Sequence, residues 1–398
     1  MSDDTPRPAA HIPRNRRDDT SPEIIAARRE FVRQRTGTTL EHLAHHSVDP
    51  TTLPGNIENF VGVAQVPIGI AGPIRIHGEH ASGDYVIPLA TTEGTLVASY
   101  NRGMRLLTEA GGVRTTVVET AMQRAPVFML ADAVEAREFG AWVDDHLDAI
   151  RSAAESTTHA GHLVGVDQYA VGPLRYLRFN YTTGDAAGQN MTGKATLAAC
   201  EWIREHHPTH PGFMLSGSID TDKKHSQINM LQTRGRRVVA EAVVPHDLLR
   251  DMMGVESAEL FQLRQISNAG SFLAGAASNG AHAANALAAL FIATGQDAAN
   301  VAESHAGMVY SQLLDSGDYY WSITLPSLIV ATVGGGTGLA TQRECLAMLG
   351  CDGPGRVHRL AEICAAVVLA GEVSLSSAVL AGDWVTSHER LGRNREAR

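Results

Sequence analysis

Four short segments each carry a titratable side chain among residues that are mostly small or weakly charged. The segment Ser216–Lys224, SGSIDTDKK, sets two ammonium groups beside two carboxylates, and the others hold Glu93 in ATTEG, Asp297 in GQDAAN and His388 in TSHE. With Lys223 they supply an acid, a cation, a carboxylate to tune the cation, and a second proton donor. This set suits polar reduction of an acyl group, because a fixed cation stabilises the oxyanion that forms at the carbonyl.

Reducing a thioester to an alcohol takes two hydrides and passes through an aldehyde. Lys223 would stabilise the oxyanions, with Asp297 holding and tuning it. Glu93 would give a proton to the aldehyde-level oxygen, and His388 would protonate the departing thiolate. Taken singly, the last three have simpler interpretations: Glu93 as a helix-dipole partner, Asp297 as a loop residue or cap, and His388 as a solvent-exposed side chain.

All four segments resemble, in the same chain order, the hydroxymethylglutaryl-coenzyme A reductase family. The similarity spans roughly residues 55–392 and includes ENFVG from Glu58, ATTEGTLVASYNRG at 90–103, NGAHAAN at 279–285, TVGGGT at 332–337 and AGEVSL at 370–375. The resemblance implies that Glu93, Lys223, Asp297 and His388 are catalytic. The implied reaction reduces 3-hydroxy-3-methylglutaryl-coenzyme A to mevalonate and coenzyme A, in a homodimer whose active site lies at the subunit interface.

The same resemblance implies substrate-binding residues. Positions that match contacts to the acyl part are Arg124, Ser216, Asp222, Lys224, His282 and Asn285, and positions that match contacts to coenzyme A or substrate are Ser99 and Arg102. Arg124 would bind a terminal carboxylate, helped by Ser216 and Lys224. An ungapped count puts Gln265 where the family has a further lysine, and a shift by one residue puts Arg264 there.

The expected nicotinamide site departs from the family pattern. Residues 184–191 read GDAAGQNM where the family usually has Asp-Ala-Met-Gly-Met-Asn-Met, so that Asp185, Gly188 and Asn190 remain while Ala187 and Gln189 replace methionines. No Gly-x-Gly-x-x-Gly pattern lies here, so a Rossmann site is disfavoured. The segment precedes an expected helix, whose N-terminal amides could hold a pyrophosphate.

Cofactor choice rests on two positions before that segment. Thr158 and His159 stand where NADPH-using members have serine and arginine. Threonine can still donate a hydrogen bond, but a neutral histidine attracts a phosphate far less than a guanidinium does. We therefore expect a relaxed preference that favours NADPH slightly over NADH.

Hydrophobic patterning predicts an α+β fold. A large mixed α/β substrate domain, residues 62–124 and 218–398, would hold a buried helix near 281–293. An inserted domain, residues 125–217, has the ferredoxin-like order β-α-β-β-α-β, and the family resemblance implies that this domain binds NAD(P). Residues 1–20 would form a disordered tail and 21–61 a helical segment that starts at the N-cap Ser21.

Composition limits the classes of protein that fit. The 398 residues are 44% hydrophobic, and 33 Lys and Arg against 43 Asp and Glu give a net charge of -10, which offers no basic field for nucleic acid or an anionic membrane. The four cysteines lack zinc-site spacing and fit a reducing cytoplasm, and no metal is implied. No signal peptide or membrane-spanning helix is expected. Two alternatives stay open: a reductase of another 3-hydroxyacyl thioester, and a non-catalytic binding protein.

Overall fold

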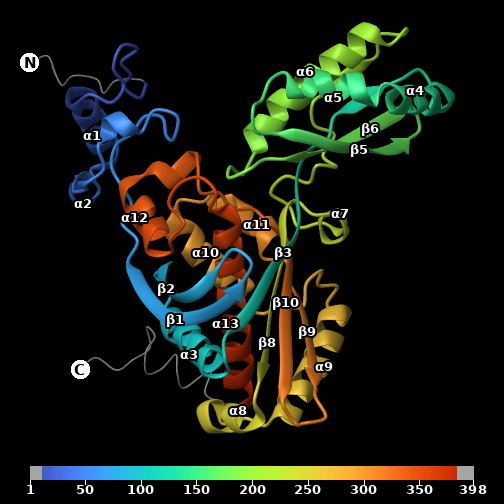
Figure 1. Ribbon diagram of the computed structural model, residues 1–398. Coiled ribbons are helices and arrows are strands. Elements are labelled where there is room, and N and C mark those ends of the chain that lie inside the picture. Colours follow the sequence, from blue (N-terminus) through green and yellow to red (C-terminus); the bar gives the residue numbers. More distant parts are fainter. Residues whose placement is uncertain (1–10, 383–398) are drawn as a thin grey trace, which may run out of the picture.

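The computed structural model describes residues 11–382, so the predicted catalytic residue His388 lies outside the described residues. The strands of this part form one hydrogen-bonded assembly, in the order β7-β4-β6-β3-β8-β10-β9, with β1, β2 and β5 attached beside it. Strand β3 (Val113–Arg124) joins its two parts, because most of it pairs with β8 and its last three residues pair with β6. Figure 1 shows a small body above a large body, connected through β3.

The strands of the large body form its sheet and the hairpin beside it. They are β1 (Ile68–Gly78), β2 (Ser82–Ala90), β8 (Gly235–Val244), β9 (Met308–Leu313), β10 (Tyr319–Leu328) and most of β3. β3, β8, β10 and β9 are antiparallel neighbours, whereas β1 pairs in parallel with β3. Val238, Ala240 and Val244 of β8 are fully buried. This period of two turns one face of the sheet to the core.

Helix α13 (Val357–Leu380) runs through the middle of the large body. It packs against α3 (Leu96–Glu109), α9 (Ser257–Leu273), α10 (Ala283–Thr294) and the sheet. By length and composition alone α13 could cross a membrane, but most of it is buried inside this structure. A helix that is apolar on all sides is typical of a core position. The buried helix predicted near 281–293 is therefore present as α10 (Ala283–Thr294), and α13 is a second, longer buried helix that the sequence analysis did not predict.

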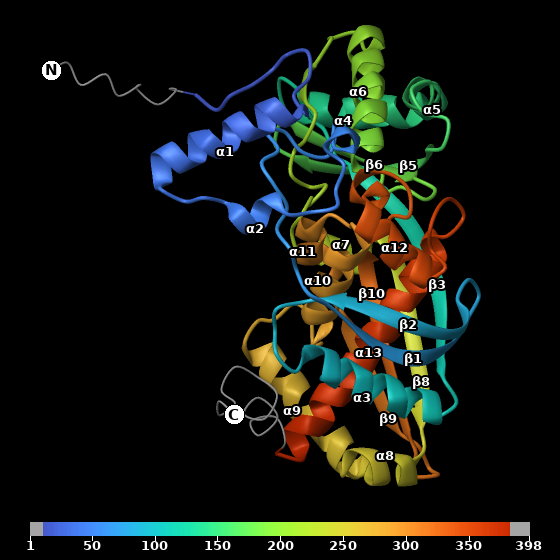
Figure 2. The same cartoon turned by 90° about the vertical axis from the view of Figure 1, so that its left-hand side faces the viewer.

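Shorter helices complete the large body and lie mostly in its connections. They are α7 (Gln227–Leu231), α8 (His246–Met253), α11 (Val301–Ser304), α12 (Ala340–Met348) and the 3-10 turns η2 (Ala298–Asn300) and η3 (Gly335–Gly338). Figure 2 shows α10, α11 and α12 at the end of the large body that faces the small body. This end carries most of the residues discussed below.

The small body has the predicted ferredoxin-like order. It contains β4 (Val127–Met129), α4 (Ala133–Asp145), α5 (Leu147–Glu155), β5 (His162–Val171), β6 (Leu174–Thr182), α6 (Gln189–His206) and β7 (Gly212–Met214). Its antiparallel strands lie in the order β7-β4-β6-β5, and the first expected helix is divided into α4 and α5 at His146. A separate core that includes Phe128, Phe139 and Ile203 holds α4, α5 and α6 on the sheet.

Residues at the N-terminal end pack on α1 (Pro22–Thr36), which Ser21 caps as predicted by accepting the Ile24 N–H. The buried Arg28 donates to the carbonyls of Pro13 and Asp19. Residues 13–19 are therefore bound to α1, whereas the sequence predicted a disordered tail through residue 20. The short helix α2 (Glu41–Ala44) and the turn η1 (Pro50–Thr52) lead from α1 to β1.

The start of α3 differs from the prediction. The helix begins at Leu96 instead of Glu93, because Thr95 adopts a left-handed φ of 74° that ends the preceding loop. The N–H of Glu93 donates to the Thr91 hydroxyl, which forms a local turn between β2 and α3. Glu93 is therefore an exposed loop residue two positions ahead of the helix N-cap.

Helices α3 and α13 cross so closely that Gly103 has no room for a side chain. A Cβ there would lie 1.9 Å from the Ala370 carbonyl oxygen. We expect Gly103→Ala to lower the free energy of unfolding by about 2 kcal/mol or more, because neither backbone can move without disturbing the core. Gly270→Ala in α9 is the matched control, since no atom lies within 4 Å of its Cβ position. It should leave stability unchanged or raise it by up to about 1 kcal/mol, and an equal loss in both variants in urea unfolding would contradict the close crossing.

Candidate active site

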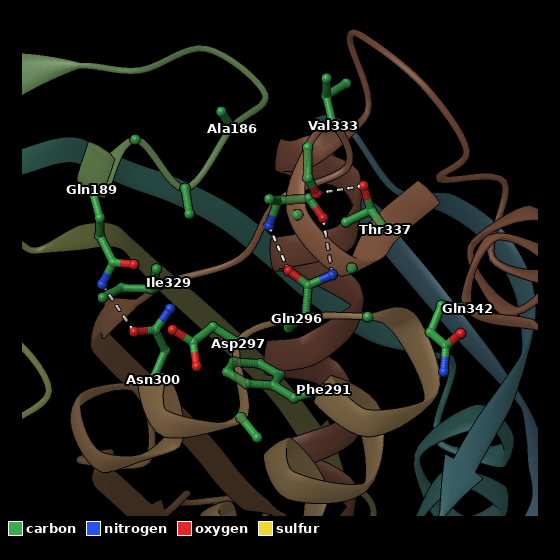
Figure 3. Close-up of a pocket in the computed structure, with 18 of the residues that line it drawn as sticks. Ala186, Gln189, Phe291, Gln296, Asp297, Asn300, Ile329, Val333, Thr337 and Gln342 are labelled. Atoms are coloured by element: carbon green, nitrogen blue, oxygen red, sulfur yellow. Dashed lines mark hydrogen bonds between the residues drawn. The ribbon is translucent and has the colours of Figure 1, made fainter. Parts of the chain in front are cut away.

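A cavity of about 680 Å³ lies where the small body meets the large body. One wall is the segment 186–191, which leads into α6, and the opposite wall is the glycine-rich segment 333–337. Gln296, Asp297 and Asn300 lie between these walls (Figure 3). The cavity therefore brings together three segments that the sequence analysis singled out.

Hydrogen bonds to distant segments of the chain fix both walls. The Asp185 carboxylate accepts the backbone N–H groups of residues 355–357 at the start of α13, and its carbonyl accepts the Thr332 N–H. Arg236, which is buried, donates to the carbonyls of Gly184 and Val330. Asp185 was predicted to bind the cofactor, but its carboxylate instead binds the backbone at the start of α13 and so holds the segment 186–191 in place.

The first turn of α6 faces this cavity. Gly188 is its N-cap with φ 86°, and Asn190 follows on the cavity lining. First-turn N–H groups have no acceptor within their own helix, so they are free to bind an anion. Thr158 and His159 lie in the loop after α5, where Thr158 accepts two backbone N–H groups and His159 is exposed. Gly161 of that loop packs against Met191, so the loop lies beside the cavity wall.

Lys223 and Asp297 form the predicted pair. Lys223 Nζ lies 2.8 Å from Asp297 Oδ2, and both side chains are about half-exposed. This hydrogen bond raises the pKa of Lys223 against the opposing effect of partial burial, so the lysine is a cation at neutral pH. Asp297 also accepts the Ala299 N–H, which fixes its carboxylate at the start of η2.

The backbone of Lys223 is anchored by a buried ion pair that the sequence analysis missed. Lys223 has a left-handed φ of 54°, and its N–H donates to Glu303 Oε1. Arg234 Nε lies 2.7 Å from Glu303 Oε2, and Arg234 Nη2 lies 2.7 Å from Asp222 Oδ1. Burial raises the pKa of Glu303 to about 7, while Arg234 acts in the opposite direction. The segment 297–303 thus holds Lys223 at both its side chain and its backbone.

Arg124 and Ser216 meet at a carboxylate that the sequence analysis did not assign. Arg124 Nη1 lies 3.0 Å from Asp220 Oδ2, and the Ser216 hydroxyl lies 3.2 Å from the same oxygen. Lys224 is exposed, and its ammonium group donates to the Asp222 carbonyl. One loop cluster therefore includes or borders most of these side chains. We define the lysine group as Arg124, Ser216, Asp222, Lys223, Lys224 and Asp297.

A second group, the histidine group, contains Ser99, Arg102, His282 and Asn285. His282 is buried, stacks on Tyr100 at 4.6 Å between ring centroids, and has its two ring nitrogens 3.1 Å from Asn285 Nδ2 and 3.5 Å from the Ser99 hydroxyl. Arg102 donates to the hydroxyl and carbonyl of Ser374. Burial lowers the pKa of His282 to about 4, so its imidazole is neutral at pH 7.

The two groups lie at opposite ends of α10. His282 precedes this 12-residue helix and Asp297 follows it, so the helix separates them by about 18 Å. Glu93 precedes α3, the helix that carries Ser99 and Arg102 of the histidine group. Within residues 11–382, no hydrogen bond or ion pair joins Glu93 to Lys223, whose ammonium group pairs with Asp297.

Comparisons with known proteins decide the family. A sequence model of the hydroxymethylglutaryl-coenzyme A reductases matches residues 24–393. The 3-hydroxy-3-methylglutaryl-coenzyme A reductase of Methanothermobacter thermautotrophicus is 43% identical, over 93% of this chain and 94% of that protein. That of Aeropyrum pernix is 44% identical, over 93% and 90%. The chain belongs to the hydroxymethylglutaryl-coenzyme A reductase family.

The fold agrees with this assignment. A class II 3-hydroxy-3-methylglutaryl-CoA reductase of Streptococcus pneumoniae, solved with NADPH in open conformations, matches with a TM-score of 0.68 at 18% identity. The match covers 90% of this chain and 93% of that one. The α+β architecture predicted from the sequence is thereby confirmed for this member of the reductase family.

The further family lysine has two candidates here, and the structure separates them. Gln265 is exposed on α9. Arg264 is buried and donates to the Asn279 carbonyl and the Asn268 side chain. Arg264 therefore lies beside the segment that carries His282, whereas Gln265 is directed to solvent.

The buried neutral state of His282 makes stability depend on pH. The pKa of His282 falls from 6.5 to about 4 on folding. The contribution of the neutral imidazole to the free energy of unfolding is therefore fully present above pH 6.5 and is lost as pH falls toward 4. Between pH 7 and pH 5, we expect the free energy of unfolding to fall by about 2 kcal/mol more in the wild type than in His282→Gln. Urea unfolding at both pH values measures this, with His42→Gln at an exposed histidine as the control. The same pH dependence in His282→Gln and wild type would contradict the assignment.

Proposed function

We propose that this protein catalyses reduction of 3-hydroxy-3-methylglutaryl-coenzyme A to mevalonate and coenzyme A, with two equivalents of a reduced nicotinamide cofactor. The observation that carries the proposal is the Lys223–Asp297 pair at 2.8 Å, whose aspartate lines a cavity large enough for part of a dinucleotide. A non-catalytic binding protein would have no use for a cation held by both its ammonium group and its backbone amide.

Lys223 is the electrostatic centre of the proposed reaction. When bound, the nicotinamide cofactor supplies hydride. The ammonium group stabilises the oxyanion formed in each of the two reductions, and its raised pKa keeps it protonated at neutral pH. Asp297 fixes its direction. Glu93 gives a proton to the aldehyde-level oxygen, and His388, by its resemblance alone, protonates the thiolate of coenzyme A.

The cofactor is proposed to lie on the first turn of α6. The free N–H groups there suit a pyrophosphate, and Gly188 lets the backbone approach closely. The Thr158–His159 loop beside Met191 is near enough to meet the adenosine end, so NADPH is favoured slightly over NADH. The NADPH-bound streptococcal reductase has the same fold. Residues 125–217 would form the cofactor domain, and residues 62–124 with 218–398 the substrate domain.

The separation of the lysine group from the histidine group supports a homodimer. About 18 Å along α10 is too far for the two groups to act on one carbonyl, so we infer that each active site takes one group from each subunit. An apolar surface for association is present: Phe272 and Leu273 of α9 are each 88% exposed, and Tyr310 of the adjoining β9 is 60% exposed. The fully assembled enzyme would act in the cytoplasm.

The substrate class follows from the lysine group. Arg124 and Lys224 give it cationic side chains that suit a terminal carboxylate. A related thioester without that carboxylate is the second candidate substrate. Turnover of hydroxymethylglutaryl-coenzyme A against an analogue with a distal methyl group distinguishes the two.

The reaction is tested by cofactor oxidation at 340 nm with and without the thioester. The wild type should oxidise two cofactors per thioester, and Lys223→Ala should abolish reduction of both thioester and free mevaldehyde, because it removes stabilisation made mainly in the transition state. The exposed Lys194 of α6 provides the control variant Lys194→Ala, which should keep wild-type turnover. Thioester-independent oxidation, or full activity of Lys223→Ala, would contradict the proposal.

The shared site is tested by combining two inactive chains. Lys223→Ala and Glu93→Ala, carrying different tags, are co-expressed and the heterodimer is purified. One of its two sites then holds neither substitution, so about half of wild-type activity should return. If both groups acted within one chain, the heterodimer would stay inactive.

A further inference from the structure

Gln189 reaches from the small body to the loops that hold Lys223. It is the first residue of α6, and its amide Nε2 lies 3.0 Å from Asp222 Oδ1 and 3.0 Å from Asn300 Oδ1. Asp222 directly precedes Lys223, and Asn300 follows Asp297 by three residues. Figure 3 shows Gln189 on the cavity wall with its amide directed to Asn300, close to Asp297.

The chemistry of its partners fixes the orientation of this amide. The Asp222 carboxylate can only accept a hydrogen bond, so the NH2 end of Gln189 must face it. The amide oxygen accepts no hydrogen bond from the part of the chain that the structure describes, residues 11–382. Both amide N–H groups are thus committed, one to Asp222 and one to Asn300, and the oxygen stays available to the cavity that Gln189 lines.

Lys223 depends on such contacts because its backbone is not in a relaxed conformation. A left-handed φ of 54° is uncommon for lysine and persists only where neighbours enforce it. Glu303 and Asp297 hold Lys223 from the large body. Asp222 is held by Arg234 from the large body and by Gln189 from the small body. Gln189 therefore links the cofactor-side wall to the lysine.

We propose that Gln189 is a positioning residue for Lys223, which couples the cofactor-side wall of the cavity to the catalytic cation. The proposal rests on the proposed function, since it places a dinucleotide on the first turn of α6. Gln189 is already held on Asp222 and Asn300 without a ligand, and it fixes Asp222 and hence the direction of the Lys223 ammonium group beside the dinucleotide. Loss of the bridge therefore affects turnover and leaves cofactor affinity almost unchanged.

Gln189→Met tests this directly, because methionine has a similar length but donates no hydrogen bond. We expect kcat to fall roughly tenfold or more for both the thioester and mevaldehyde, because a hydrogen bond to a charged group is lost. The KM values should stay within about twofold of those of the wild type. Gln34→Met, which removes an exposed amide hydrogen bond on α1, should leave kcat unchanged. Gln189→Asn, whose amide is one methylene too short for both acceptors, should also lose turnover.

Gln189→Glu adds a pH readout that a packing role would not produce. The introduced carboxylate faces Asp222, so turnover should be lower than in Gln189→Met at pH 8. As pH falls toward 6, the new carboxyl group is protonated and its O–H can donate a hydrogen bond. The turnover of Gln189→Glu relative to wild type should then recover, whereas the turnover of Gln189→Met relative to wild type should not. Unchanged kcat in Gln189→Met, or a rise in cofactor KM alone, overturns the proposal. Failure of the wild type to oxidise cofactor with the thioester would instead overturn the proposed function.

Discussion

Three carboxylates around helix α13 fix the segments that build the site. Asp185 accepts the N–H groups of residues 355–357 at the start of the helix, Glu362 accepts those of residues 79–81, and Glu372 accepts those of residues 281–283. Glu362 and Glu372 are fully buried. Burying a carboxylate is costly unless donors replace its water, and three amides do so here. The same contacts occupy Glu362, which lies near Glu79 and His80 in the one potential metal cluster found among residues 11–382.

This arrangement explains why the site is divided between the ends of α10. Glu372 holds the start of α10, and with it His282, against α13, while the far end of α10 leads into Asp297 and Glu303. A rigid helix that spans the core keeps the two groups apart in every copy of the chain. The constraint that stabilises the fold is thus the same one that keeps the lysine group and the histidine group apart within one chain.

Local signals in the sequence were enough for much of this fold. The cap at Ser21 predicted the start of α1, the stretch near 281–293 predicted the buried helix α10, and the order of elements predicted the ferredoxin-like body. The pairing of Lys223 with Asp297 also followed from the resemblance. By contrast, the start of α3 depends on the left-handed backbone conformation of Thr95. Threonine rarely adopts this conformation, so the sequence gives no sign of it.

What the sequence could not provide are contacts between distant segments. Arg234 and Glu303 are 69 residues apart, and Gln189 and Asn300 are 111 apart. Each looks like an ordinary polar residue in its own segment, and only the folded chain places them around Lys223. No periodicity or spacing in the sequence carries that information, although Glu303 stands only six residues after Asp297.

Asp185 shows how a residue can serve a site without facing it. Its carboxylate binds the start of α13 and its carbonyl binds Thr332, so one residue connects the segment 186–191 with the opposite wall. Arg236 also connects the two walls, because it donates to the carbonyls of Gly184 and Val330. The distance between the walls is therefore set by polar contacts within the chain before any ligand enters, and the cavity is already largely formed. The part left to adjust is the Gln189 side chain, which lies between that preformed cavity and the strained backbone of Lys223.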